Sequence, residues 1–519
     1  MVFKISNEEK ERYAKLKEYI SINNGEFLNL GQLLDFANTR FAKNIALIYK
    51  DQKINYQKLF WYAATFANKI KEKDIKPRDR VLLFFENSLE FFIGYYAIAQ
   101  VGAVVVPLNT FLKDRELQHI IQDAQPALLI ASSALLEKLK EEHIALKVPI
   151  LTEKDMDLQI SDHGSLESVP AYLHPDEMAA LLYTSGTTGL PKGVMLSAKN
   201  IFTNCIQTIA RFGMVQDERI FGVLPFFHSL AQLTYIWAPL LMGCTVIIVP
   251  KIDRRAILNN LVHQPTIFIG VPALFGLLCL MKTVPLEGIN YFITGGDAMP
   301  DKIRASFEML YNRKIGAGYG LSETSPVLTA DLEDKAEPTS NVGTPLLGIE
   351  VEIRDEHGLV VKNNSIGQIW VKGDNVMLGY YNEPSKTDQV IKEGWFDTGD
   401  LGYFSCGGKL IVTGRVKDLI AHKGFKIYPQ EVENVILMHP NVLRVAVIGL
   451  VDEDVGEIPI AFVQLKEPEE LMEVTLQEFC ARNLASYKVP RKFICSLEQL
   501  PLTAMGKVDK KMLRQKKIV

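Results

Sequence analysis

Residues suited to binding an anion are concentrated in one short segment, Tyr183 to Ser197, with the sequence YTSGTTGLPKGVMLS. The segment carries four hydroxyl side chains, on Thr184, Ser185, Thr187 and Thr188. Its glycines, Gly186 and Gly189, let backbone N–H groups turn toward an anion because no Cβ stands in the way. Lys192 adds a positive charge. We therefore predict a polyphosphate-binding loop, which points to ATP chemistry.

This loop differs from a Walker A motif, which requires G-x-x-x-x-G-K-[ST]. Counting from Gly186, the position of the second glycine is Pro191, and Gly193 follows Lys192 where Ser or Thr is required. The plainer alternative is a polar surface loop, but such loops rarely combine four hydroxyls with glycine and lysine. The segment thus indicates a nucleotide without naming the reaction.

Two further groups of residues suit the rest of a nucleotide. Tyr319 stands between Gly318 and Gly320, where its ring can lie against a purine, and the carboxylate of Glu323 can reach a hard cation. The alternative for this segment is a tight turn with a core tyrosine.

Farther along, Asp400 is suited to bind a ribose diol, and Arg415 is suited to pair with phosphate or ribose oxygens. For these two residues the alternative is a surface ion pair.

Bulk properties narrow the class of protein. A chain of 519 residues is too long for a single core, so we expect at least two domains. A net charge of −4 and a pI near 6.2 lack the basic footprint of a nucleic-acid-binding protein.

Six cysteines without a C-x-x-C pair argue against a zinc site or a disulfide framework. The charged N-terminal segment predicts an amphipathic helix rather than a signal peptide. We expect a cytoplasmic location.

The segment from Pro225 to Pro250 contains no Asp, Glu, Lys or Arg and is long enough to cross a bilayer. Proline and glycine interrupt it at Pro239 and Gly243. We therefore expect a helix ending near Met242 and then a strand, not a transmembrane span. Peripheral attachment to the inner face of a membrane stays open as an alternative.

Apolar runs of strand length alternate with segments of helix length, which predicts an α/β fold with mainly parallel sheets. The runs lie at 81–85, 103–107, 127–130, 245–249 and 266–269. We expect an N-terminal domain, 1–416, that closes with a β-rich subdomain at about 342–416. Residues 417–519 predict a small α+β domain with helices at 429–439 and 476–485 and strands at 442–449 and 458–465.

Taken together and in this order, the motifs resemble those of the adenylate-forming superfamily of acyl-CoA synthetases, adenylation domains and luciferases. The resemblance covers nearly the whole chain. It extends to a hinge motif at Gly414 to Asp418, to the segment Thr294 to Ala298, and to a C-terminal lysine, Lys507.

The resemblance implies a ligase that joins a carboxylic acid to AMP from Mg-ATP and then transfers the acyl group to CoA. By resemblance, Lys507 is the catalytic lysine, Thr184 and Glu323 hold magnesium, and His228 orients the carboxylate, with a packed core histidine as the alternative for His228. The residues expected to contact ATP or CoA are Thr184, Ser185, Gly186, Thr187, Thr188, Gly189, Lys192, Gly296, Asp297, Ala298, Gly318, Tyr319, Gly320, Ser322, Asp400, Arg415, Gly424 and Lys507.

The resemblance also implies that the C-terminal domain rotates about Lys417, so that the segment around Gly424 replaces Lys507 at the site for the thiol step. Small and apolar residues favour a medium- or long-chain fatty acid. Three alternatives are an aryl-CoA ligase, an acyl-AMP ligase that loads an acyl carrier protein, and a catalytically silent lipid-binding relative. Oligomerisation is left open.

Overall fold

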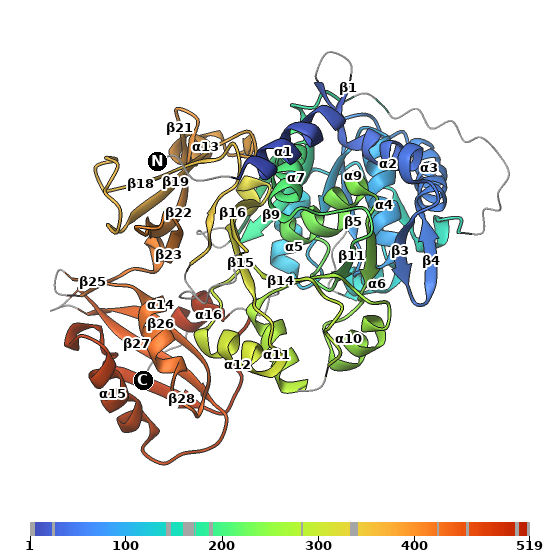
Figure 1. The fold of residues 1–519 in the computed structure, drawn as a ribbon. Helices are drawn as coiled ribbons and strands as arrows, with labels where there is room; N and C mark the ends of the chain where they lie inside the picture. The colour runs from blue at the N-terminus through green and yellow to red at the C-terminus, as the bar shows by residue number, and fades with distance from the viewer. Residues whose placement is uncertain are drawn as a thin grey trace.

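The structure is a computed structural model. It describes residues 6–22, 26–141, 147–158, 171, 173–185, 190–281, 284–332, 341–422, 425–452, 456–503 and 508–515. Two large sheets form most of the N-terminal part, a smaller antiparallel sheet follows, and a last sheet with its helices makes a small C-terminal α+β domain (Figure 1). The predicted fold class is thereby confirmed.

The first large sheet has seven strands in the order β20-β10-β9-β6-β5-β7-β8. Its inner pairs are parallel, whereas β9, β10 and β20 pair antiparallel at one edge. Three of the predicted runs are strands here. The bounds are β5 Arg80–Phe84, β6 Val104–Pro107, β7 Leu128–Ala131, β8 Ile150–Thr152, β9 Met178–Ser185, β10 Pro191–Ser197 and β20 Gly379–Tyr380.

The second large sheet has nine strands in the order β17-β16-β15-β14-β13-β11-β12-β3-β4. The six from β15 to β3 are mutually parallel. The bounds are β3 Ile45–Tyr49, β4 Gln52–Asn55, β11 Arg219–Gly222, β12 Thr245–Ile248, β13 Ile267–Gly270, β14 Tyr291–Thr294, β15 Gly316–Gly320, β16 Val327–Asp331 and β17 Thr344–Pro345. A separate small hairpin joins β1 Ser21–Ile22 and β2 Glu26–Phe27.

Helices cover these sheets, and α7 contacts both of them, through β9 and β10 on one side and β16 on the other. Nearly every residue of α7 is buried, as expected of a helix enclosed on all sides. The bounds are α1 Asn7–Tyr19, α2 Leu33–Phe41, α3 Tyr56–Lys71, α4 Leu89–Gln100, α5 Asp114–Ala124, α6 Ser133–Glu141, α7 Ala198–Phe212, α10 Arg254–Leu261, α11 Pro272–Met281, α12 Asp301–Tyr311 and α13 Pro384–Val390.

The third sheet is antiparallel throughout and matches the predicted β-rich segment. Its strands are β18 Glu350–Arg354, β19 Gly367–Lys372, β21 Ile391–Lys392, β22 Trp395–Phe404 and β23 Leu410–Arg415. The last sheet packs against two helices around its own apolar cluster. Its elements are β24 Ile420–His422, β25 Phe425–Ile427, α14 Pro429–Leu437, β26 Val442–Asp452, β27 Gly456–Leu465, α15 Met472–Asn483, β28 Lys492–Ser496 and the terminal α16 Lys510–Gln515.

The uncharged segment from Pro225 to Pro250 folds inside the large unit. It forms α8 (Ser229–Ala231), a π-helical turn (Gln232–Trp237) and α9 (Ala238–Met242), and then continues into β12. Helix α9 ends at Met242, where the sequence predicted a helix end, and Gly243 follows it in a left-handed conformation. In the part of the chain that the structure describes, we find no helix with the length and apolarity needed to span a membrane.

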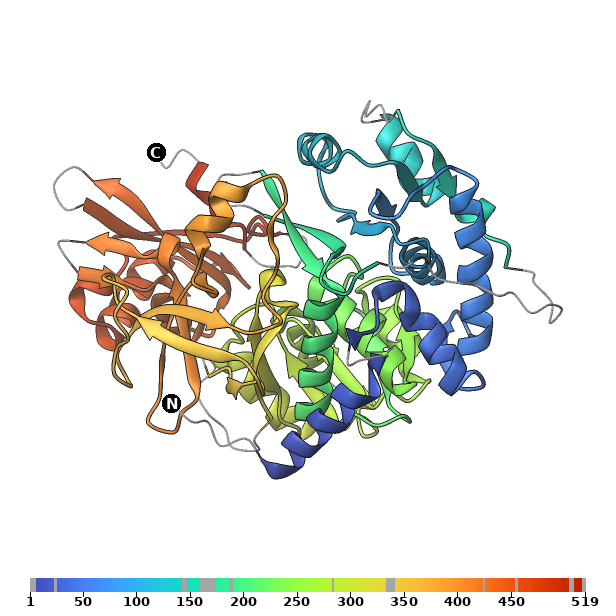
Figure 2. The same ribbon diagram turned by 90° about the horizontal axis from the view of Figure 1, so that it is seen from above.

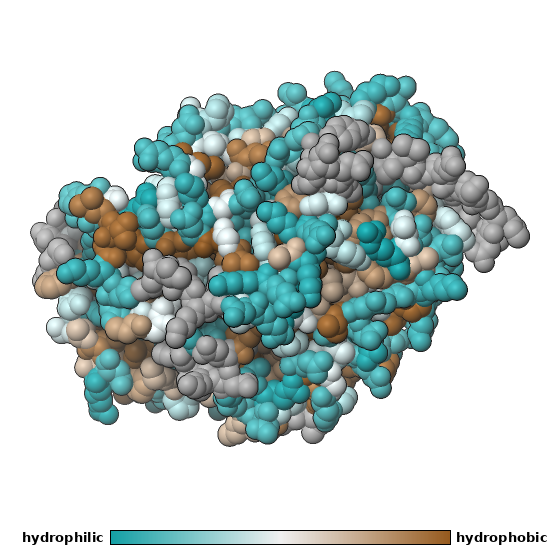
Figure 3. Space-filling model, turned by 45° about the horizontal axis from the view of Figure 1, so that its top comes forward, coloured by the Kyte–Doolittle hydropathy of each residue, from teal (hydrophilic) through white to brown (hydrophobic). Residues whose placement is uncertain are grey.

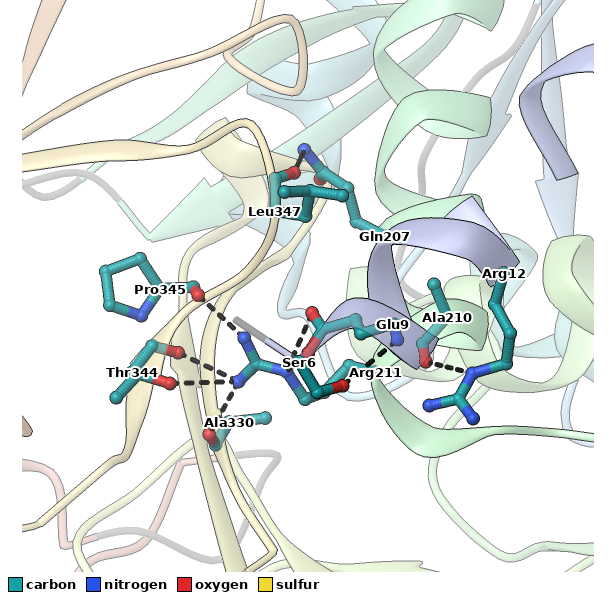
Figure 4. A network of polar contacts seen from close by, with 10 residues as sticks. All are labelled: Ser6, Glu9, Arg12, Gln207, Ala210, Arg211, Ala330, Thr344, Pro345 and Leu347. Atoms are coloured by element: carbon teal, nitrogen blue, oxygen red, sulfur yellow. Dashed lines mark hydrogen bonds and ion pairs between the residues drawn. The ribbon is translucent and has the colours of Figure 1, made fainter. Parts of the chain in front are cut away.

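The N-terminal helix α1 lies beside α7 (Figure 2), and its Glu9 carboxylate contacts Arg211 of α7. The single N–H on Nε of Arg211 is shared between the two carboxylate oxygens of Glu9, each at 3.0 Å, and the Glu9 and Arg211 side chains are only 8% and 10% exposed. Figure 4 shows the guanidinium directed at strands β16 and β17. Its other bonds go to Ala330 O, Thr344 O, Thr344 Oγ1 and Pro345 O. The sequence predicted this helix but not its buried ion pair.

The face drawn in Figure 3 is largely hydrophilic, with hydrophobic side chains gathered in smaller areas. Most apolar side chains instead fill one extended core shared by both large sheets. The two large sheets therefore pack as one unit, which is stabilised by the apolar area buried between them and which carries the site.

Candidate active site

A cavity of about 1510 Å³ lies where the parallel strands of the nine-stranded sheet end. Ligands in open α/β sheets bind at this carboxyl edge. The large unit contributes Thr184, Tyr319 and Asp400 to its lining, and the C-terminal domain contributes Glu433 and Thr503. The cavity therefore joins residues that are more than 300 positions apart in the sequence.

One end of the cavity, called here the phosphate end, holds the residues that the sequence predicts to bind phosphates. There the antiparallel pairing of β9 with β10 places Lys192 directly opposite Thr184. The Lys192 Nζ lies 4.0 Å from the centroid of the Tyr380 ring. The Tyr380 hydroxyl in turn donates a 3.0 Å hydrogen bond to Oε1 of Glu323, which stands in the 3-10 turn Ser322–Thr324. Burial lowers the pKa of Lys192, although the Glu323 carboxylate opposes this shift. Two predicted site residues, Lys192 and Glu323, thus meet around one tyrosine.

Helix α5 holds both described ends of the predicted phosphate loop. The Tyr183 hydroxyl donates a 2.6 Å hydrogen bond to Oδ2 of Asp123, and Asn382 also donates to the Asp123 carboxylate. One turn earlier on α5, Nε2 of His119 lies 2.9 Å from the carbonyl oxygen of Pro191. Because α5 is part of the core, these contacts fix where the loop leaves and rejoins the hairpin.

The residues that the sequence predicts to bind the nucleoside, Tyr319, Asp400 and Arg415, form one network. The Tyr319 hydroxyl donates a 2.7 Å hydrogen bond to Oδ2 of Asp400, and Arg415 Nε lies 3.1 Å from Oδ1. Asp400 and Arg415 are directly paired across β22 and β23, which explains how the acid, only 4% exposed, keeps a cation beside it. Burial and the Asp400 carboxylate raise the pKa of Tyr319, so its hydroxyl stays a donor.

Gly320 has a packing reason for being glycine. A Cβ built on Gly320 would collide with the carbonyl oxygen of Pro326 in the turn that leads to β16. Gly318 is less crowded, because a Cβ at that position would lie 3.4 Å from Thr329 O, an ordinary contact distance. Gly320 therefore allows the close approach of the segment before β16, in addition to the purine contact that the sequence predicts for this motif.

His228 caps the short helix α8, where its Nδ1 accepts a 3.3 Å hydrogen bond from the Leu230 N–H. In a neutral ring this arrangement leaves the proton on Nε2. The side chain is half-buried and lines the cavity. Beside it, the hydroxyls of Ser229 and Ser322 lie 2.9 Å apart. The expected role of His228 in orienting a carboxylate stays a prediction.

Three predicted residues follow the end of β14 as an exposed loop that lines the cavity, namely Gly296, Asp297 and Ala298. Gly296 has φ +82°, and Asp297 Oδ1 accepts the Ala298 N–H. Of Ser185 the structure describes the backbone at the end of β9. The remaining predictions, Gly186, Thr187, Thr188, Gly189, Gly424 and Lys507, lie outside the described residues.

The residues on both sides of Lys507 nevertheless contribute to the site. Thr503 and Val508 line the cavity, and Leu502 pairs with Val508 in an isolated bridge. Lys510 follows at the start of α16 and binds Glu433 of α14 with a distance of 2.6 Å. The C-terminal segment is therefore anchored at the cavity wall.

The donor set suits magnesium. Magnesium prefers oxygen ligands and usually takes only one or two carboxylates, with phosphates and water completing the shell. Glu323 supplies a carboxylate and Thr184 a hydroxyl in the same cavity. Among the described residues there is no cluster of three or more histidine, cysteine or acidic side chains of the kind that holds a structural metal.

Comparison with protein families decides the class. The AMP-binding enzyme family matches residues 34–381, and the AMP-binding enzyme C-terminal domain matches residues 431–507.

The chain belongs to the AMP-binding enzymes.

Similar proteins of this family are CoA ligases. The chain is 30% identical to a long-chain-fatty-acid–CoA ligase of Bacillus subtilis, over 93% of this chain and 94% of the relative. It is 31% identical to a 2-succinylbenzoate–CoA ligase of the same organism, over 91% and 95%. A 4-coumarate–CoA ligase of Solanum tuberosum is 29% identical over 97% and 94%. The chain is thus an AMP-forming CoA ligase, but the acids named for its relatives differ.

Solved structures agree with this assignment. ATP-bound MatB from Rhodopseudomonas palustris superposes with a TM-score of 0.84 at 29% identity, covering 94% of this chain and 99% of that one. The apo form of MatB gives 0.71. The o-succinylbenzoate–CoA synthetase of Bacillus subtilis with ATP and magnesium gives 0.84 at 29% identity, covering 93% and 99%. ATP, magnesium and CoA, which the sequence predicted, are therefore confirmed for the family.

Sequence reasoning missed several residues of this AMP-binding enzyme. Tyr380, Asp123 and His119 each contact a predicted site residue or the phosphate loop. The run Gly379-Tyr380-Tyr381 was a visible signal, since a tyrosine that becomes buried usually directs its hydroxyl to a hydrogen-bond partner. Neither Asp123 nor His119 stands out, because both belong to an ordinary amphipathic helix.

Proposed function

We propose that this AMP-forming CoA ligase activates a medium- or long-chain fatty acid with Mg-ATP and transfers the acyl group to CoA. The observation that carries this proposal is the apolar part of the cavity. It extends between α7, the π-helical turn and strands β11 and β13, and its lining comprises Thr208, Phe212, Met214, Ile220, Leu233, Thr234, Ala238, Ile267 and Ile269. None of these residues is charged.

The volume supports the same conclusion. Sites for one small ligand typically occupy about 300–1,000 Å³. The cavity of about 1510 Å³ exceeds that range, so it has room for an acyl chain beside a nucleotide. Each buried methylene contributes about 0.8 kcal/mol to binding, so an apolar wall of this extent favours longer chains.

The first half-reaction brings two anions together, and the site supplies cations for it. The acid's carboxylate oxygen attacks the α-phosphorus of ATP, the bond to the β-phosphate oxygen breaks, and pyrophosphate leaves. Lys192 and the loop hold the departing phosphates, while Arg415 and Lys507 offset charge at the reacting oxygens. Glu323 and Thr184 would hold magnesium, which would supply further charge neutralisation at the phosphates.

The other residues position the nucleoside and the acid. Tyr319 provides a face for adenine, and Asp400 accepts hydrogen bonds from the ribose hydroxyls. His228, with its proton on Nε2, donates a hydrogen bond to the acid before attack. In the second half-reaction the CoA sulfur attacks the acyl carbon, and AMP leaves.

The thiol step requires a different arrangement of the C-terminal domain. We place the domain boundary between residues 416 and 417 and the hinge at Lys417, in the 3-10 turn Val416–Asp418 between β23 and β24. The present arrangement suits adenylate formation, since the residues flanking Lys507 line the cavity. The higher TM-score to ATP-bound than to apo MatB supports the same view.

The test is a substrate panel. Purified protein is incubated with Mg-ATP and acids from acetate to oleate, plus cinnamate and benzoate, with and without CoA, and the products are identified by mass spectrometry. We expect acyl-CoA from the longer aliphatic acids. Preference for cinnamate or benzoate would instead assign an aryl acid as the substrate. Relatives named for such acids include the 2-succinylbenzoate and 4-coumarate ligases. Acyl-AMP that persists in the presence of CoA would assign a carrier-protein acceptor.

A further inference from the structure

Tyr380 contacts two of the charged residues at the phosphate end and is itself only 5% exposed. Its ring lies under the Lys192 ammonium, 4.0 Å from ring centroid to Nζ, and its hydroxyl donates to Oε1 of Glu323 at 3.0 Å. A single side chain therefore spans the distance between the loop's lysine and the carboxylate proposed to hold magnesium.

The backbone around Tyr380 fixes that position. Strand β20 pairs antiparallel with β10, where Tyr380 stands opposite Val194, two residues from Lys192 on the same face. The Tyr380 N–H donates a 2.9 Å hydrogen bond to Oγ1 of Thr387. Tyr380 is thus held in the same sheet as the phosphate hairpin.

The residues before Tyr380 also hold the turn that carries Glu323. The Met377 N–H donates to the backbone carbonyl of Glu323 at 2.9 Å, and Nδ2 of Asn375 donates to Thr324 O at 2.8 Å. Glu323 is therefore bound by one short segment at both its main chain and its side chain. If Tyr380 were only a core tyrosine that fills space, these contacts to both the main chain and the side chain of Glu323 would not be needed.

The chemistry of each contact is selective. An ordinary phenol is protonated at neutral pH, so the Tyr380 hydroxyl is the donor in its hydrogen bond to Oε1 of Glu323. A hydrogen bond to Oε1 fixes the plane of the Glu323 carboxylate, and Oε2 takes no part in this bond. Residues that hydrogen-bond to a metal ligand commonly orient it in this way. An aromatic face attracts the Lys192 ammonium without neutralising it, so the charge stays available to phosphate.

We propose that Tyr380 is a positioning residue that orients the Glu323 carboxylate toward the metal and holds Lys192 toward the phosphates. This inference rests on the proposed function. It assigns the two contacts to separate parts of the side chain, since the hydroxyl serves Glu323 and the ring serves Lys192. The two parts can be removed one at a time.

Two variants and a matched control test this division. Tyr380→Phe removes the hydroxyl and keeps the ring, and Tyr380→Leu removes both. Tyr381→Phe, at the neighbouring half-buried tyrosine, is the control for loss of a hydroxyl from this segment. Binding of Mn²⁺ is measured by electron paramagnetic resonance on protein saturated with a non-hydrolysable ATP analogue, and binding of the analogue alone is measured by calorimetry.

We expect Tyr380→Phe to weaken Mn²⁺ binding by about 10- to 100-fold, as for other residues that orient metal ligands, while the affinity for the metal-free analogue is unchanged. Tyr380→Leu should weaken both, and Tyr381→Phe neither. In adenylate formation, Tyr380→Phe should raise the Mg²⁺ concentration needed for half-maximal rate, with excess Mg²⁺ restoring kcat. A residue that only supported the fold would lower kcat without this rescue.

The outcomes separate this inference from the proposed function. Wild-type Mn²⁺ affinity in Tyr380→Phe, or equal losses in Tyr380→Phe and Tyr381→Phe, overturns the positioning role even when the wild-type protein forms acyl-adenylate. A wild-type protein that binds Mn²⁺ and nucleotide but activates no fatty acid overturns the substrate assignment, and the metal data still decide the role of Tyr380.

Discussion

Removing the Glu9 carboxylate should loosen the strands next to the nucleoside site. In Glu9→Ala the Arg211 guanidinium keeps its bonds to carbonyl oxygens of β16 and β17 but loses its charged partner. β16 pairs with β15, which carries Tyr319, so the effect of a change on α1 passes through two strands to the cavity.

The magnitude follows from burial. Both side chains are about nine-tenths buried, and breaking a buried pair by removing one partner costs about 3–5 kcal/mol because a charge is left uncompensated. At about 1.36 kcal/mol per factor of ten, this corresponds to about 160- to 5000-fold more frequent local opening.

Glu8→Gln is the matched control. Glu8 stands beside Glu9 in the first turn of α1 and pairs with Arg12, but it is 79% exposed. Such a pair contributes about 0.3–0.5 kcal/mol, or about twofold.

Amide hydrogen exchange read by mass spectrometry measures this opening locally, which suits a chain with more than one domain, because two-state analysis of global unfolding does not hold for multidomain proteins. We expect protection at residues 327–331 to fall sharply in Glu9→Ala and hardly at all in Glu8→Gln. Equal protection in both variants would refute the reasoning, since it would mean that the bonds of Arg211 to carbonyl oxygens suffice without Glu9.

Three other outcomes can be checked by enzyme kinetics. Lys507→Ala should reduce adenylate formation by orders of magnitude and leave thioesterification of preformed acyl-AMP largely intact, because its charge acts on the α-phosphate step; equal loss in both steps would contradict its role. Asp123→Asn should raise the KM for ATP about tenfold by weakening a charged hydrogen bond to Tyr183, with the KM for the acid unchanged. Phe212→Ala should raise kcat/KM for stearate relative to octanoate, since the ring borders the apolar part of the cavity, and an unchanged ratio would remove Phe212 from the acyl wall.

Much of the fold could be predicted because buried parallel strands read as continuous apolar runs. The runs at 81–85, 103–107 and 245–249 became β5, β6 and β12 with shifts of a residue at most. Helix α15 begins at Met472, before the predicted start at 476, and no capping hydrogen bond marks that start. Chemical motifs such as Asp400 and Arg415 were identifiable one at a time, but their direct pairing depends on the register of β22 and β23.

The misses have a common physical cause. Glu9 looked like an ordinary solvent-facing charge on a helix, because its partner lies 202 positions away in the sequence. Tyr380 belongs to a strand of two residues, too short for any periodicity to reveal. Contacts of this kind are created by tertiary packing, so a local sequence pattern can draw attention to a residue such as Tyr380 but does not identify its partners.

The position of β3 in the nine-stranded sheet has a consequence for biosynthesis. β3 lies between β4 and β12, and its pairing with β12 joins Leu47 to Val246. A ribosome adding about 5–20 residues per second needs about 10–40 s to make the intervening chain. During that interval one edge of the β3–β4 hairpin lacks its partner strand, and such an edge can pair with other chains. Nascent chains halted before residue 245 should therefore be the form of this protein most in need of a chaperone.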